Sequence, residues 1–355
     1  MRMTEKVLEV YLLQLLRAQP GGEITVAWQG GEPTLMGVDF FQRSITLVNK
    51  LRRSGQRVSY TLQTNGTLLD EKWCKFFKQH DFLIGLSLDG TDEMHDAYRV
   101  NQAGGGSFDR ALRSWNLLHK HQVQTNILCA VHAANASRPL EVYRFFRDTL
   151  GAQFVQFIPI VERLNSSPCA PVEEQVSPRS VKPDQYGSFL SAIFDEWVQH
   201  DIGSMFIQGF EAALASWCGL PASLCIFQQV CGRSVILEHN GDLYSCDHFV
   251  DSDHRLGNIL ERSMVELVRS AQQRQFGLDK RERLPECCRK CQVLFACQGE
   301  CPRNRFAREP GGEGNRLNYL CPSYKAFFHH IDGPMRQMAD LLRRGRAPAE
   351  IMPRL

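Results

Sequence analysis

The sequence lacks long apolar runs and has almost no net charge. No stretch reaches the roughly 18 apolar residues that a membrane-spanning helix requires. A net charge of +2 over 355 residues leaves no excess of either sign for nucleic acid or an anionic membrane. Residues 1–19 lack the apolar core of an export signal, because polar and acidic side chains interrupt every apolar run. We therefore expect a cytoplasmic protein whose main partner is neither nucleic acid nor a membrane.

Cysteine, by contrast, is abundant and unevenly placed. Of the 13 cysteines, ten lie between Cys218 and Cys321. In a reducing compartment, clustered thiols indicate metal ligands rather than disulfides. A disulfide-stapled secreted domain also fits poorly with a chain of this length and without an export signal. The cysteine-rich region therefore predicts metal binding.

The spacing of these cysteines separates them into two series. The first has C-x5-C-x14-C spacing, with Asp247 directly after it, and consists of Cys225, Cys231 and Cys246. The second has C-x2-C-x5-C-x3-C spacing, is followed by Cys321, and consists of Cys288, Cys291, Cys297 and Cys301. Eight cysteines suffice for two sites of four thiolates each, and the spacing leaves zinc and iron–sulfur clusters both open. Cys287 stands outside this spacing.

Before the cysteine-rich region, helical and strand patterns alternate from residue 3 to about residue 200. Apolar runs predict buried strands at 24–28, 58–62, 82–88, 126–132 and 154–159. Helical spacing of apolar residues predicts helices at 38–54, 69–80, 107–122, 136–150 and 184–200. Repeated strand–helix–strand units imply parallel strands with right-handed crossovers. We predict an α/β domain over 1–200, a cysteine-rich domain over 201–323, and an amphipathic helix in the tail, 324–355.

Polar residues and glycines follow three successive predicted strands. Gln29, Gly30, Gly31 and Glu32 follow the first strand, "QTNG" (63–66) follows the second, and "SLDG" (87–90) with Arg99 follows the third. Turn chemistry explains each residue taken singly, but together they indicate a ligand site at the carboxyl ends of the strands. Glu32 could accept a hydrogen bond from an ammonium group, and Arg99 could clasp a carboxylate. S-adenosylmethionine carries both groups.

These motifs resemble those of a known family. "WQGGEPTL" (28–35), "QTNG", "SLDG" and the cysteine series with Cys246-Asp247 resemble the radical S-adenosylmethionine enzymes that carry a C-terminal SPASM domain, and among them the anaerobic sulfatase-maturating enzymes. The resemblance covers nearly the whole chain. It implies an α/β fold with a partial (β/α)6 barrel, its first strand missing from this sequence, followed by a SPASM domain at 201–323.

The resemblance also implies cofactors and residue roles. It implies two auxiliary [4Fe–4S] clusters, one held by Cys225, Cys231, Cys246 and Cys301, and the other by Cys288, Cys291, Cys297 and Cys321. S-adenosylmethionine would be held by Gly30, Gly31, Glu32, Ser87 and Arg99. Gln29 would lie near the substrate, and Asp247 would be the general base. The implied reaction oxidises one Cys or Ser of an unfolded sulfatase to Cα-formylglycine, with flavodoxin or ferredoxin as an electron donor or acceptor.

The sequence departs from this family in one respect. It contains no C-x3-C-x2-C series to hold the cluster that cleaves S-adenosylmethionine. Because Asp247 and all eight auxiliary cysteines are present, we expect a wrong start or an interrupted gene rather than a non-catalytic remnant. Two alternatives remain open, namely another SPASM peptide-modifying enzyme and a truncated metal-binding module. The sequence does not distinguish a Cys-type from a Ser-type substrate.

Overall fold

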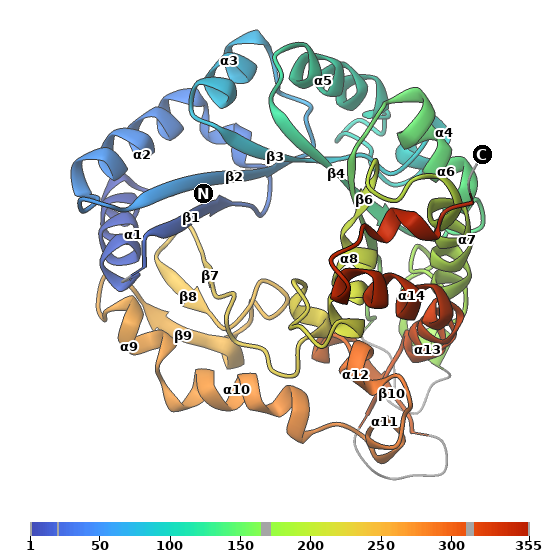
Figure 1. Cartoon of the computed structure of the whole chain (residues 1–355). Helices are drawn as coiled ribbons and strands as arrows, with labels where there is room; N and C mark the ends of the chain where they lie inside the picture. The colour runs from blue at the N-terminus through green and yellow to red at the C-terminus, as the bar shows by residue number, and fades with distance from the viewer. Residues whose placement is uncertain (1, 20, 165–171, 310–315, 354–355) are drawn as a thin grey trace. The chain divides into compact units, whose positions relative to one another are not determined.

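The computed structural model describes residues 2–19, 21–164, 172–309 and 316–353 (Figure 1). Six strands form one sheet in the order β1-β2-β3-β4-β5-β6. They are β1 (Glu23–Trp28), β2 (Arg57–Thr64), β3 (Phe82–Ser87), β4 (Gln124–Val131), β5 (Phe154–Pro159) and β6 (Phe206–Ile207). The pairs β1–β2, β4–β5 and β5–β6 are parallel. The predicted α/β class with a parallel sheet is confirmed. Strand β6 was not predicted, because two residues are too few to show a pattern.

Helices alternate with these strands, as the sequence predicted. The helices of the first 217 residues are α1 (Glu5–Ala18), α2 (Val38–Leu51), α3 (Glu71–Gln79), α4 (Asp92–Asp96), α5 (Phe108–Lys120), α6 (Pro139–Arg144), α7 (Gln185–His200) and α8 (Gln208–Trp217). A short 3-10 helix, η1 (Pro33–Met36), follows β1 directly. A π-helical turn at Phe145–Thr149 extends α6, so the predicted helix at 136–150 has two parts.

The described residues after Trp217 form mostly short elements. Strands β7 (Ile236–Leu237), β8 (Asp242–Tyr244) and β9 (Arg255–Asn258) make a three-stranded antiparallel sheet, and β10 (Arg305–Ala307) pairs with β11 (Leu317–Asn318). The helices of this region are α9 (Met264–Val268), α10 (Ala271–Glu282), α11 (Glu286–Arg289), α12 (Leu294–Cys297), α13 (Cys321–His330) and α14 (Asp332–Arg343).

The tail differs from the single helix that the sequence predicted within 324–355. It forms two helices that meet at Ile331, which ends α13 and begins α14. Proline lacks an N–H and its ring clashes with the carbonyl group four residues earlier. Pro334 therefore cannot continue α13, but it is tolerated in the first turn of a new helix.

The chain divides into two compact units, and the first consists of Met1–Gly85, Arg113–Thr125 and Val230–Glu282. In this unit α1 packs against the β7–β9 sheet, where Val7 shares a buried core with Leu243 and Leu256. The Gln14 side chain donates to the carbonyl of Ile259 (2.9 Å) and accepts from the N–H of Met264 (2.5 Å). Residues 230–282 are thus built onto the N-terminal helix of the same unit.

The second unit consists of Leu86–Leu112, Asn126–Gln229 and Arg283–Leu355. Its core is rich in aromatic side chains. Phe194 and Trp197 of α7 pack against Phe210 of α8, and Phe210 stacks on Phe327 of α13. The predicted boundaries at residues 200 and 323 stay a prediction. In the part of the chain that the structure describes, no helix is both long and apolar enough to span a membrane.

Candidate functional site

Two glycines with left-handed backbone angles follow β1. Gly30 has φ 86° and Gly31 has φ 54°, and both are exposed. Residues that carry a side chain rarely adopt these backbone angles, so the conformation itself requires glycine. A Cβ at either position would meet no atom within 4 Å, so space is not what demands glycine here. The turn therefore presents bare backbone groups to the surroundings, as a ligand-binding turn needs.

Glu32 closes this turn with its carboxylate. The Oε1 atom accepts hydrogen bonds from the N–H of Thr34 (3.0 Å), from Thr34 Oγ1 (2.6 Å) and from Thr64 Oγ1 (2.8 Å). The Oε2 atom accepts from the N–H of Asn65 (2.8 Å). Glu32 thus caps η1 and joins the end of β1 to the end of β2. Within the described part of the chain Oε2 accepts only this one bond, so the second of its two lone-pair positions could accept a ligand's ammonium group.

Gln29 and Asp247 lie together in the first unit. Gln29 Nε2 donates to Asp247 Oδ2 (3.3 Å) across a sequence separation of 218 residues. Asp247 Oδ1 accepts from the Sγ atom of Cys246 (3.1 Å). Asp247 is exposed, whereas Gln29 is half-buried at the end of β1. The carboxylate is therefore oriented on both oxygens and remains open to an incoming group.

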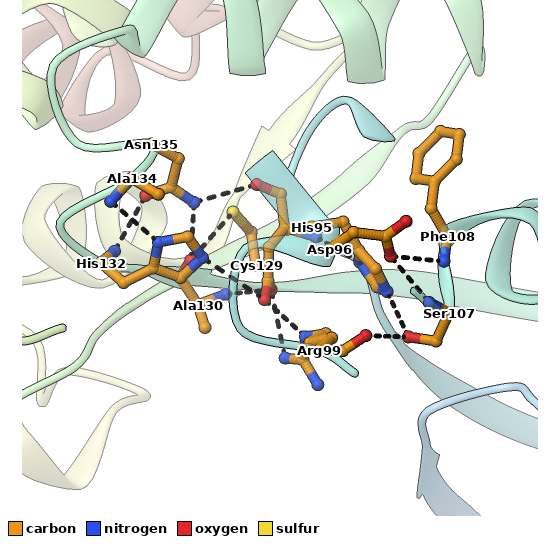
Figure 2. Close-up of polar contacts among 11 residues, drawn as sticks. His95, Asp96, Arg99, Ser107, Phe108, Cys129, Ala130, His132, Ala134 and Asn135 are labelled. Atoms are coloured by element: carbon orange, nitrogen blue, oxygen red, sulfur yellow. Dashed lines mark hydrogen bonds and ion pairs between the residues drawn. The ribbon is translucent and has the colours of Figure 1, made fainter. Parts of the chain in front are cut away.

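Ser87 and Arg99 belong to the second unit. Ser87 ends β3 and is half-buried. Arg99 follows α4 and forms an ion pair with Asp89, in which Nε lies 2.5 Å from Oδ2 and Nη2 lies 3.1 Å from Oδ1 (Figure 2). Asp89 is one residue of the "SLDG" motif, and its side chain is only 2% exposed. The sequence predicted no separate role for Asp89.

The stretch "HDAYR" (95–99) contains a sequence signal for the partners of Asp89. His95 and Arg99 are four residues apart, a spacing that places two side chains on one face of a helix. The structure brings both to the "SLDG" turn, where the N–H of Asp89 donates to His95 Nδ1 (3.3 Å). A charged residue at helical spacing from a histidine, next to a glycine turn, could have identified these residues from the sequence.

Four of the predicted metal ligands line one cavity in the second unit. The cavity has a volume of about 160 Å³, and its lining includes Cys288, Cys291, Cys297 and Cys321 together with Cys287. These cysteines are not in disulfides. The described residues contain no group of three or more histidines, cysteines or carboxylates placed for a single metal ion. The cavity is several times larger than the roughly 30 Å³ that a water molecule takes up in the liquid, so it has room for a group of several atoms.

The electrostatics of this cavity fit a cationic metal group. Burial raises the pKa of the Cys297 thiol to about 12 and that of Cys321 to about 11. Burial also raises the pKa of Cys288 well above its ordinary value. Thiolates in such surroundings need a nearby positive charge, which iron ions supply when they replace the protons. The residues therefore fit a [4Fe–4S] cluster held by four thiolates.

The other predicted set of ligands is divided between the two units. Cys231 and Cys246 belong to the first unit, and both are half-buried. Cys225 and Cys301 belong to the second, in which Cys225 is exposed and Cys301 is buried. This set stays a prediction.

Comparisons with known proteins agree with these features. Residues 2–146 match the model of the radical SAM superfamily, and residues 225–292 match that of the SPASM iron–sulfur cluster-binding domain. A serine-type anaerobic sulfatase-maturating enzyme of Bacteroides thetaiotaomicron is 40% identical over 358 residues, which cover 99% of this chain and 86% of that protein. A cysteine-type enzyme of Clostridium perfringens is 34% identical over 330 residues, covering 92% and 86%.

A solved structure is also similar over almost the whole chain. Native anSMEcpe with bound AdoMet and Cp18Cys peptide matches with a TM-score of 0.87 and 33% sequence identity, over 96% of this chain and 92% of that one. The alignments by sequence and by structure thus each cover more than nine-tenths of this chain. The chain belongs to the family of anaerobic sulfatase-maturating enzymes, within the radical S-adenosylmethionine superfamily.

Proposed function

We propose that this protein oxidises one Cys or Ser of an unfolded sulfatase to Cα-formylglycine. The observation that carries the proposal is the contact between Gln29 and Asp247, which joins the end of the first strand to the residue after a predicted cluster ligand. The exposed carboxylate of Asp247 can accept a proton from a thiol or hydroxyl group within hydrogen-bond reach. Gln29 donates to Oδ2 of Asp247 and so fixes the direction in which Oδ1 faces.

The oxidation removes two electrons from the target residue. S-adenosylmethionine and iron–sulfur clusters supply the radical chemistry and the route for electrons when they are bound. In our proposal the protein contributes three things. Asp247 takes the thiol or hydroxyl proton, the Gly30–Gly31 turn and Glu32 receive the ammonium end of S-adenosylmethionine, and Ser87 and Arg99 receive its carboxylate. The ligand sets of both auxiliary clusters, with four cysteines each, are part of the same proposal.

The test uses the chain completed with the proposed upstream segment that carries the C-x3-C-x2-C series, because residues 1–355 contain no such series. The completed protein is reconstituted anaerobically with iron and sulfide and supplied with S-adenosylmethionine and a reductant. Two sulfatase peptides that differ only in Cys or Ser at the target position are incubated with it. We expect a peptide product with an aldehyde, seen by mass spectrometry and by reaction with a hydrazide. Cleavage of S-adenosylmethionine with no change in the mass of either peptide would rule the proposal out.

Two aspartate variants test the role of Asp247. We expect Asp247→Asn to lower peptide conversion by about 10²-fold or more, the usual contribution of a general base, while its iron content stays unchanged. Asp251→Asn is the matched control, because Asp251 is an aspartate of the same loop that caps a short helix through the N–H groups of Asp253 and His254. Asparagine caps helices as well as aspartate does. Equal activity of both variants would contradict the assignment.

The proposal also includes an upstream segment, a redox partner and a cellular location. The cysteines of the radical-generating cluster are proposed to be encoded ahead of Met1, because residues 1–355 contain no C-x3-C-x2-C series. Reading the upstream DNA in all three frames tests this. Flavodoxin or ferredoxin is the proposed electron donor or acceptor, which electron transfer between each and the purified protein would test. A cytoplasmic location is proposed because thiolate ligands require a reducing compartment.

A further inference from the structure

Asp89 lies at the centre of a network of polar contacts. Its partners include His95, Arg99, Ala130 and Asn135, which are labelled in Figure 2. Asp89 lies in the turn between β3 and α4 and is 1% exposed. A buried carboxylate is stable only where hydrogen bonds and an opposite charge compensate it. In this structure both of its oxygens and both of its backbone polar groups have partners in the second unit, so its position is fixed at four points.

Two of these partners hold the backbone of Asp89. Its N–H donates to His95 Nδ1 (3.3 Å), and its carbonyl accepts from Asn135 Nδ2 (2.9 Å). Because Nδ1 of His95 is an acceptor, its proton is on Nε2, which lies 3.0 Å from Ser107 Oγ. Ser107 Oγ in turn donates to the carbonyl of Arg99 (2.7 Å). The neutral imidazole thus links the backbone of Asp89 to the backbone of Arg99.

The other partners hold the carboxylate. Oδ1 accepts from the N–H of Ala130 (2.8 Å), at the end of β4, and both oxygens accept from Arg99. His132 Nε2 lies 3.7 Å from Oδ2, which is beyond hydrogen-bond distance. Burial by itself would raise the pKa of Asp89, but the adjacent His132 ring, the charge and hydrogen bonds of Arg99, and the N–H of Ala130 hold that pKa below its ordinary value. Asp89 therefore remains an anion next to the guanidinium.

The pairing uses only one edge of the guanidinium. Arginine has five N–H donors in a planar fork, and Asp89 takes one from Nε and one from Nη2. Among the residues that the structure describes, Asp89 is the only side chain bonded to this guanidinium. The edge formed by Nη1 and the second N–H of Nη2 remains, and the Arg99 side chain is 28% exposed. That edge has the geometry for a bidentate bond to a second carboxylate.

We propose that Asp89 is a positioning residue that fixes Arg99 so that its outer edge selects ligands bearing a carboxylate. The inference rests on the proposed function, in which Arg99 receives the carboxylate of S-adenosylmethionine. It adds that the selection depends on Asp89, which does not touch the ligand. Without Asp89 the guanidinium keeps its charge but loses its orientation, and a bidentate bond needs the orientation.

The experiment compares two ligands that differ only in the carboxylate. Affinities for S-adenosylmethionine and for decarboxylated S-adenosylmethionine are measured by anaerobic equilibrium dialysis with the cluster-loaded protein. In Asp89→Asn the amide can still accept from Ala130, but its NH₂ group faces the guanidinium donors. We expect this variant to bind S-adenosylmethionine roughly tenfold more weakly, a loss typical of one hydrogen bond to a charged group. The affinity for the decarboxylated ligand should change less than about twofold.

Two further variants make the test specific. Asp96→Asn is the matched control, because Asp96 accepts from the N–H groups of Ser107 and Phe108 at the start of α5 and does not bond Arg99. The double variant Asp89→Asn/Arg99→Gln removes both charges, so it leaves no buried ion unpaired. If Asp89 acts through Arg99, the double variant binds S-adenosylmethionine no more weakly than Arg99→Gln does.

Three results would overturn the inference. They are equal weakening of both ligands by Asp89→Asn, unchanged affinity for both, or a further loss when Asp89→Asn is added to Arg99→Gln. Failure of the proposed function looks different, because there the unsubstituted protein discriminates between the ligands and yet converts no sulfatase peptide. Dialysis and peptide conversion therefore report on the two proposals separately.

Discussion

The carboxylate of Glu32 provides the sharpest test of how the end of β1 is held. Glu32→Ala removes the acceptor of four hydrogen bonds, two from backbone N–H groups and two from the hydroxyls of Thr34 and Thr64. Both threonines are 3% exposed, so water cannot easily replace the lost partner. We expect the substitution to destabilise the first unit.

The magnitude follows from these contacts. Loss of a helix cap costs about 1 kcal/mol. A buried donor left without an acceptor costs about 1–3 kcal/mol, and the two threonine hydroxyls together with the N–H of Asn65 are affected. Because some of these groups will find new partners, we expect a loss of about 3 kcal/mol in the free energy of unfolding. Glu32→Gln keeps one oxygen but presents an NH₂ group to the N–H of Asn65, so about half of that loss should remain.

The assay is urea-induced unfolding followed by the fluorescence of tryptophan, since Trp28 lies in β1 beside the turn. Glu23→Ala is the control, because Glu23 lies in the same strand but forms an exposed ion pair with Arg57, and such pairs contribute little. A midpoint for Glu32→Ala equal to that of Glu23→Ala would refute the reasoning, since it would mean that the four bonds do not hold the turn.

Three other predictions follow from the structure. Gln29→Ala should lower peptide conversion about tenfold by releasing the Asp247 carboxylate, and it should leave iron content unchanged; unaltered conversion by mass spectrometry would contradict the role of Gln29. Burial lowers the pKa of His95 from 6.5 to about 4, so the neutral ring stabilises the fold above pH 6.5, and this contribution is lost as the pH falls toward 4. Between pH 7 and pH 5 the free energy of unfolding should therefore fall by about 2 kcal/mol more in the unsubstituted protein than in His95→Gln. An equal fall in both proteins would refute the role of the neutral His95 ring. Cys297→Ser should remove one four-iron cluster, measured as iron per chain, whereas Cys218→Ser, outside the cavity, should remove none; a full iron content in Cys297→Ser would contradict the ligand set.

Much of the fold could be predicted from the sequence because its signals are local. The apolar runs placed β1 to β5 within about two residues of their observed bounds, and the helical stripes placed α2, α3, α5 and α7. The family predicted from "WQGGEPTL" and the cysteine spacing was confirmed by a relative that is 40% identical over 99% of this chain. The break at Ile331 was missed, because an apolar stripe continues across it, although Pro334 was a visible signal for a new helix.

The candidate site was predicted only in part. The sequence identified Gly30, Gly31 and Glu32 through turn chemistry, but it could not show that Glu32 already accepts four hydrogen bonds from its own chain. Two of those bonds depend on the pairing of β1 with β2, which brings Thr64 and Asn65 to the same turn. The role of Asp89 was missed for the same reason, since its partners lie on α4 and just after it, at the end of β4, and in the segment that follows β4.

The sequence by itself determined which residues are available, the order of the elements and the α/β class, because backbone propensity and side-chain periodicity act between near neighbours. Only the tertiary structure decided which of these residues meet. Gln29 and Asp247 are 218 residues apart and meet within one unit in which α1 packs on the β7–β9 sheet. Four cysteines from α11, α12, α13 and the loop between them line one cavity for a similar reason. Burial of apolar surface brings such distant segments together, and it depends on the whole folded unit rather than on any local stretch.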